Sequence, residues 1–214
     1  SSLYSSASAG FSGPLKRPIA MLSFALNYYF SGGYLASAFK ITNIAIHCLN
    51  AILVFSLCFQ LFKRTYITTA KTHYSNTLLL LASGISLTWA IHPINLTSVL
   101  YVVQRMTSLS TLFGLSCIIS YLAARNRWLR HSFSWRVIGL FFLSFISLLL
   151  ALFSKENAVL IPLIILLIEL LFYLNEKPLR FINFLSKQQK IACLSIITAI
   201  SISALLWAIE HASG

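Results

Sequence analysis

The chain has 214 residues, of which 58% are hydrophobic and only 9% are charged, and its mean hydropathy is +0.83. A soluble domain carries about a quarter charged residues, so the composition excludes an ordinary water-soluble globule. The amount of apolar surface also excludes a disordered chain. We therefore expect an all-α, polytopic transmembrane helix bundle in a lipid bilayer.

The first expected element is an interfacial helix in an external loop. Residues 18–30 are apolar, but a bilayer span takes about 20 residues, so this run is too short to cross. Tyr28, Tyr29 and Tyr34 cluster at its end, and tyrosines favour the membrane interface. Residues 1–35 are therefore predicted to form an external loop that carries this helix.

Apolar runs of spanning length follow along the rest of the chain. His92-Pro93 divides one long run, because proline disfavours helical geometry in the residue before it. We predict a transmembrane bundle over residues 36–209 and an external tail at 210–214. Its six spanning helices are expected at about 36–62, 76–92, 97–124, 137–153, 157–174 and 191–209.

The basic residues alternate between the two ends of these predicted helices. Eleven of the 16 Lys and Arg residues lie in the loops after the first, third and fifth helices. Cytoplasmic loops of membrane proteins are rich in Lys and Arg, so we place these loops in the cytoplasm and the others outside. The net charge of +12 then needs no nucleic-acid partner. An external, Ser-rich start without a signal sequence suggests a further span upstream of Ser1.

Polar residues form a stripe on the first predicted span. Lys40, Asn43, His47 and Asn50 are spaced three, four and three residues apart, which places them on one helix face. The stripe could line a hydrophilic cavity, or it could form hydrogen bonds between helices. Interhelical bonding is the favoured interpretation for Asn43 and Asn50, and both interpretations stay open for Lys40 and His47.

A second polar face opens the third predicted span, with Tyr101, Gln104, Arg105 and Ser108. A buried arginine costs roughly 2.5–3.5 kcal/mol on insertion scales, so Arg105 should have an anionic partner. Glu156 could be that partner, and so could a phosphate, whose oxygens match the guanidinium fork. The alternative is that Arg105 extends to the interface.

The predicted outer turn at residues 154–157 places Lys155 beside Glu156. It could be a simple solvated loop, or Glu156 could pair with a buried cation while Lys155 faces an anionic ligand. We expect His92, Arg105 and this turn to converge on one outer pocket. Glu169, toward the other end, is expected to pair with a nearby Lys, Arg or backbone group.

No metal-ligand or disulfide spacing is present. The four cysteines, Cys48, Cys58, Cys117 and Cys193, lie singly in apolar runs, so we expect buried packing thiols. No cofactor is predicted from the residues, and the need for a divalent metal stays open.

Four motifs in order over residues 17–174 resemble a known family. Residues 17–29 (RPIAMLSFALNYY) match a "GRPL…SFALNY" loop, and 39–50 match an "FHLxNxxxHxxN" helix. Residues 89–106 match "ALHP…VxYVxxR", and 152–158 match "LLSKExA". These are motifs of TMTC-type protein O-mannosyltransferases and their bacterial tetratricopeptide-linked relatives. Lys16 replaces a glycine and Lys40 a histidine of the family pattern.

The resemblance implies a GT-C membrane glycosyltransferase. Such an enzyme moves a sugar from a polyprenyl-phosphate carrier to an acceptor on the outer face, typically a Ser or Thr hydroxyl of a protein. The family's catalytic acidic residues lie in the first external loop, and this sequence begins inside that loop without an aspartate. A catalytic base is therefore expected upstream, and Glu156 is the one weak candidate in this chain.

The resemblance also assigns roles to individual residues. Arg105, Lys155 and Arg17 are expected to hold the lipid phosphate, with Glu156 orienting Arg105 or Lys155. The substrate pocket is expected to contain His92, Tyr101, Gln104, Lys40 and His47.

A different class of protein, a non-catalytic membrane subunit or a transporter, would also explain the spans and the polar stripe. Transporters often show internal repeats, and the sequence shows none. The "QRM" form of the third motif favours a bacterial inner membrane, with the endoplasmic reticulum as the alternative.

Overall fold

The computed structural model describes residues 17–69, 75–130 and 134–173. Within these ranges all regular structure is helical, and no strand occurs, which confirms the all-α prediction. Four helical segments are long and apolar enough to cross a membrane: Ala36–Thr65, Val102–Arg130, Trp135–Leu152 and Glu156–Tyr173. A fifth span is formed if the bent pair Asn76–Ile91 and Pro93–Leu100 counts as one. The described chain is a multi-pass membrane helix bundle.

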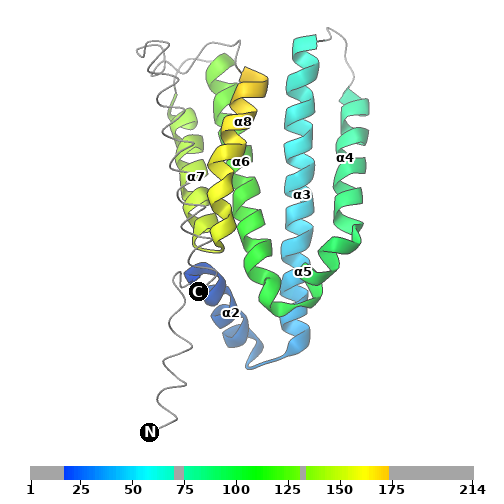
Figure 1. The fold of residues 1–214 in the computed structure, drawn as a ribbon, viewed down its shortest axis with the longest axis vertical. Helices are drawn as coiled ribbons and strands as arrows, with labels where there is room; N and C mark the ends of the chain where they lie inside the picture. The colour runs from blue at the N-terminus through cyan, green and yellow to red at the C-terminus, as the bar shows by residue number, and fades with distance from the viewer. Residues whose placement is uncertain (1–16, 70–74, 131–133, 174–214) are drawn as a thin grey trace.

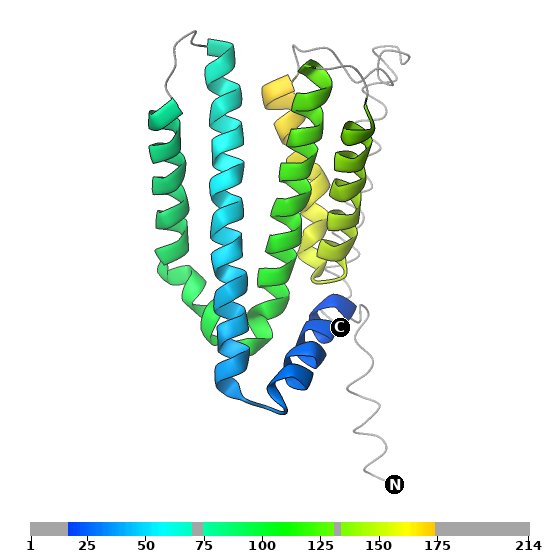
Figure 2. The same cartoon turned by 180° about the vertical axis from the view of Figure 1, so that it is seen from behind.

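The bundle is built around α6 (Arg105–Arg130), as Figure 1 shows. On one side α6 packs against α3 (Ala36–Thr69), and α3 in turn packs against α4 (Ser75–Ile91). On the other side it packs against α7 (Trp135–Leu152) and α8 (Ile161–Tyr173). The reverse view in Figure 2 shows the same order of helices. The predicted sixth span, 191–209, and the tail at 210–214 lie outside the described residues.

Helix α2 (Pro18–Ser31) crosses the end of the bundle at which α5 lies (Figures 1 and 2). Proline at its first position suits a helix start, because that position needs no hydrogen-bond donor. Gly32 ends it with φ 67°, a left-handed conformation that favours glycine. The helix predicted at 18–30 is therefore present, and its place in the membrane interface stays a prediction.

The third predicted span, 97–124, differs from the observed structure at its start. The chain first passes through η1 (Pro93–Asn95), α5 (Leu96–Leu100) and η2 (Val102–Gln104), and a continuous helix begins only at Arg105. His92 is extended (ψ 131°), and so is Tyr101 (ψ 118°), which interrupts the helix twice. Arg105 therefore opens α6, whereas the predicted span began at residue 97.

Small side chains allow the central helices to approach closely. A Cβ atom on Gly114 of α6 would lie 2.9 Å from Cδ1 of Ile161 at the start of α8. Between α6 and α7, the hydroxyl of Ser144 donates to the carbonyl of Cys117 (3.0 Å). Such small residues and interhelical hydrogen bonds stabilise membrane helix pairs, where lipid supplies no hydrophobic driving force.

The cysteine prediction holds only in part. Cys117 is buried in the core of α6, α7 and α8, whereas Cys48 is exposed on α3. The expectation that Cys48 is buried is wrong, because its helix face has no neighbour in the described bundle. Cys193 lies outside the described residues.

The basic ends of α3 and α6 lie at the same end of the bundle. Lys63 and Arg64 are near the end of α3, and Arg127 and Arg130 end α6. Figure 1 shows these two helix ends at the same end of the bundle, opposite to α2 and α5. This arrangement agrees with the alternation on which the predicted sidedness depends.

Candidate functional site

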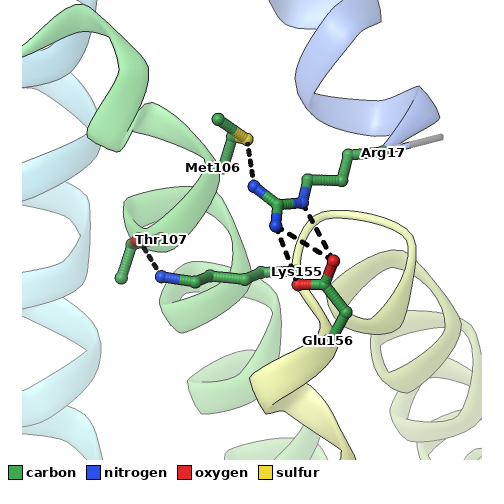
Figure 3. A network of polar contacts seen from close by, with 5 residues as sticks. All are labelled: Arg17, Met106, Thr107, Lys155 and Glu156. Carbon is green, nitrogen blue, oxygen red and sulfur yellow. Dashed lines mark hydrogen bonds and ion pairs between the residues drawn. The ribbon is translucent and has the colours of Figure 1, made fainter. Parts of the chain in front are cut away.

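Five side chains from three separate elements meet beside the N-terminus of α2 (Figure 3). Arg17 caps α2, Met106 and Thr107 form the first turn of α6, and Lys155 and Glu156 begin η3 (Glu156–Leu160). We call these five residues the Arg17–Lys155 cluster. It lies at the end of the bundle opposite to the basic helix ends.

A forked ion pair joins Arg17 to Glu156. Nε of Arg17 donates to one carboxylate oxygen (3.2 Å), and Nη2 donates to both (3.0 and 3.1 Å). The two side chains are 35% and 26% exposed, so the pair is partly accessible. The other terminal nitrogen, Nη1, contacts Sδ of Met106 at 2.9 Å. A thioether is a weak acceptor, so this donor is only weakly used.

Lys155 is the second cation of the cluster. Its Nζ donates to the hydroxyl of Thr107 (2.8 Å), which donates in turn to Oε1 of Gln104 (3.0 Å). An ammonium group has three protons, and the hydrogen bond to Thr107 uses one of them. These two hydrogen bonds link the predicted phosphate ligand Lys155 to the predicted pocket residue Gln104.

Arg105 has a different environment from the one predicted. Its side chain is fully buried, and its nitrogens donate to three neutral oxygens: Oδ1 of Asn43 (2.7 Å), the carbonyl of Phe39 (2.9 Å) and that of Ser23 (3.3 Å). The guanidinium also lies 4.9 Å from the ring centre of Phe24 and 5.2 Å from that of Phe39.

Arg105 thus ties α2 and α3 to α6. The expected carboxylate partner of Arg105, Glu156, pairs with Arg17 instead. The physical reason is that α2 and α3 both lie against the start of α6, so their carbonyl groups, the amide of Asn43 and the rings of Phe24 and Phe39 take the place of an anion. The expectation that Glu156 orients Arg105 is wrong, and the expectation that it orients Lys155 stays a prediction.

The polar stripe of α3 forms hydrogen bonds between helices. Besides accepting from Arg105, Asn43 lies 3.4 Å from the carbonyl of Tyr101. Nε2 of His47 donates to the carbonyl of Ala90 (3.0 Å), and Nδ2 of Asn50 donates to that of Ser108 (3.0 Å). The interhelical interpretation of Asn43 and Asn50 is confirmed, and His47 follows it.

Lys40, His92 and Tyr101 lie outside the cluster. Lys40 is exposed on α3, and Tyr101 is 64% exposed. His92 caps η1 by accepting from the backbone N–H of Ile94 (3.3 Å) and lines an apolar groove of about 520 Å³ along α4. The expected convergence of His92 with the outer turn is therefore not seen among the described contacts. The roles of these three residues in a substrate pocket stay predictions.

A second polar cluster ties α8 to the opposite half of α6. Arg125, with 2% of its side chain exposed, lies 2.7 Å from Oε1 of Glu169. The hydroxyl of Tyr121 donates to the other carboxylate oxygen (2.9 Å), and the hydroxyl of Tyr173 donates to Asn126 (2.8 Å). The predicted pairing of Glu169 with a basic residue is confirmed.

The sequence did not indicate every member of the Arg17–Lys155 cluster. Met106 lies in the third motif but was given no role there, and Thr107 carried no signal, because it is uncharged and lies outside the motifs. The pairing of Glu156 with Arg17 had no signal in the sequence, because the two residues are 139 positions apart. No group of three or more potential metal ligands occurs in the part of the chain that the structure describes.

Comparison with known proteins finds similar sequences among protein O-mannosyl-transferases. Over 138 residues the chain is 31% identical to human protein O-mannosyl-transferase TMTC4, and over 139 residues it is 32% identical to the mouse protein. Each match covers 62% of this chain and 18% of the relative. The Drosophila melanogaster protein O-mannosyl-transferase Tmtc2 is 31% identical over 123 residues, which cover 58% of the chain and 11% of the relative.

The chain thus spans less than a fifth of the length of these curated relatives. No family model and no solved structure matches it. The resemblance predicted from the four motifs is confirmed: the chain is similar in sequence to TMTC-type protein O-mannosyl-transferases.

Proposed function

We propose that this chain is part of a membrane glycosyltransferase that modifies proteins. In this proposal, the enzyme transfers a sugar from a polyprenyl-phosphate carrier to a Ser or Thr hydroxyl on the outer face of the membrane. The observation that carries the proposal is the 31% identity over 138 residues to a protein O-mannosyl-transferase. A bacterial inner membrane and the endoplasmic reticulum are both compatible with this activity.

The geometry of the Arg17–Lys155 cluster supports a phosphate-binding role. Two cations from different elements lie against the same turn of α6, and both keep donors that strong acceptors do not use. Guanidinium and ammonium groups are the usual protein ligands of phosphate oxygens. The cluster also lies at a bundle end, where a lipid headgroup can reach it while its chain stays among the helices.

The proposed reaction breaks the bond between the anomeric carbon and a phosphate oxygen. The acceptor oxygen forms the new bond to that carbon, its proton goes to a general base, and the bonding electron pair stays on the departing phosphate. Arg17 and Lys155 stabilise the negative charge that develops there. Preorganised cations are most effective at such a position because they need no reorganisation during the reaction.

Arg105 serves this site as a positioning residue. It fastens α2 to the bundle, and α2 carries Arg17 at its start. The two carboxylates within the described residues, Glu156 and Glu169, are both paired with arginines. We therefore assign the general base to neither of them.

The test is sugar transfer by the full-length protein in proteoliposomes, with polyprenyl-phosphate mannose labelled in the sugar and a Ser/Thr-containing acceptor peptide. Lys155→Met should lower kcat/KM by about 10²-fold, the usual effect of removing one charge-stabilising donor. Arg127→Met removes an exposed cation at the opposite end of the bundle and should leave the rate unchanged. No transfer by the wild-type protein, or equal rates for Lys155→Met and wild type, would contradict the proposal.

A further inference from the structure

The charges of the Arg17–Lys155 cluster do not cancel. Arg17 and Lys155 each contribute one positive charge and Glu156 one negative charge, so the three side chains together carry a single net positive charge. The neighbouring cation, Arg105, is fully buried, and each of its three nitrogens donates a hydrogen bond to α2 or α3. Its positive charge is therefore the same in the wild type and in every variant at Glu156.

Glu156 covers one edge of the Arg17 guanidinium, and the other edge has no oxygen acceptor among the described residues. Nε and Nη2 both donate to the carboxylate, whereas Nη1 contacts only the thioether sulfur of Met106. The Nζ of Lys155 donates to the hydroxyl of Thr107, the residue that follows Met106 (Figure 3). Nη1 of Arg17 and Nζ of Lys155 are therefore the donors that a phosphate would use while Glu156 stays in place.

This arrangement bears on the two phosphates of the proposed reaction, which differ in charge. The sugar donor is a phosphodiester with one negative charge. Transfer leaves the bonding electron pair on the phosphate and passes the acceptor proton to the base, so the product is a phosphomonoester. With a second pKa of about 6, a phosphomonoester carries close to two negative charges at pH 7.

We infer that Glu156 is a specificity-determining residue that keeps the cluster at one net positive charge. The cluster then matches the singly charged phosphodiester donor and holds the doubly charged monophosphate product too weakly to retain it. This inference rests on the proposed function. It differs from a structural role for the ion pair, because it concerns the ratio of two affinities and not the stability of the turn.

Two variants separate charge from packing. Glu156→Gln keeps the shape of the side chain and raises the net charge of the cluster to two. Its effect should be larger for the ligand with more charge, so the affinity for polyprenyl phosphate should rise about tenfold more than the affinity for the sugar phosphodiester. Glu156→Asp keeps the charge and is the matched control, with a ratio of affinities near that of the wild type.

A double variant provides a second check. Arg17→Gln combined with Glu156→Gln leaves Lys155 as the single charge and returns the net charge to one. The ratio of affinities should then return toward the wild-type value, even though the ion pair is absent. A ratio that stays high in the double variant would show that loss of the ion pair, and not the net charge, causes the change.

The experiment measures binding of the full-length protein in nanodiscs of zwitterionic lipid at pH 7.5. The probes are a short-chain polyprenyl phosphate and the same lipid as its mannosyl phosphodiester, and gel filtration and thermal melting confirm that each variant folds. A selective rise for the monophosphate in Glu156→Gln supports the inference. Equal changes for both lipids overturn it while leaving the proposed function intact. If the wild type binds neither lipid, the proposed function fails as well.

Discussion

Replacing Arg105 with methionine should loosen α2 and leave the rest of the bundle in place. Methionine replaces the apolar stem of the arginine side chain, but it is shorter and donates no hydrogen bond. In the native structure Arg105 holds α2 through the carbonyl of Ser23 and the ring of Phe24, whereas its other bonds go to α3. A helix of 14 residues such as α2 is marginal by itself in water, so it depends on such contacts.

The magnitude follows from those two contacts. A hydrogen bond from a charged donor contributes about 1.5–3 kcal/mol, and the bond to Ser23, at 3.3 Å, belongs at the lower end. The contact with the Phe24 ring adds about 0.5–1 kcal/mol. Hydration of the guanidinium when α2 detaches offsets part of both contributions. We expect a net loss of about 1–2 kcal/mol, which raises the detached population of α2 about 5- to 30-fold.

Hydrogen–deuterium exchange in nanodiscs measures this change directly, through peptides that cover residues 18–31. The control is Arg125→Met, which removes the other buried arginine of α6. Because Arg125 contacts α8 through Glu169, this variant should speed exchange in α8 and not in α2. Unchanged α2 exchange in Arg105→Met, or an equal rise in both variants, would refute the role of Arg105 as the tie between α2 and α6.

Two further predictions concern the packing of α6 against α8. In a double-mutant cycle, Arg125→Met and Glu169→Gln should show a coupling free energy of about 1–3 kcal/mol, because the bond between the two side chains is short and largely buried. The measurement is the free energy of unfolding in mixed detergent, and strictly additive effects of the two substitutions would contradict the prediction. Gly114→Leu should destabilise the bundle by about 1–3 kcal/mol, because its side chain would overlap Ile161. Gly139→Leu is the control, since a Cβ there meets nothing within 4 Å, and equal melting temperatures for the two variants would count against the close approach.

The sequence determined those features of the protein that depend on local pattern. Long apolar runs require helices in a bilayer, because every backbone donor and acceptor must be satisfied within the segment. The spacing of Asn43, His47 and Asn50 placed them on one helix face, and a polar face inside a membrane must find partners. The pairing of Glu169 with a cation followed from the cost of leaving a buried charge unpaired.

Only the tertiary structure decided which partners these groups take. Glu156 pairs with Arg17 across 139 positions of sequence, and Arg105 binds backbone and amide oxygens of α2 and α3. No local pattern contains this choice, because it depends on α2 folding back over the start of α6. The sequence therefore supplied the charges of the Arg17–Lys155 cluster, and the packing of three distant elements determined which of those charges neutralise each other and which stay available to a ligand.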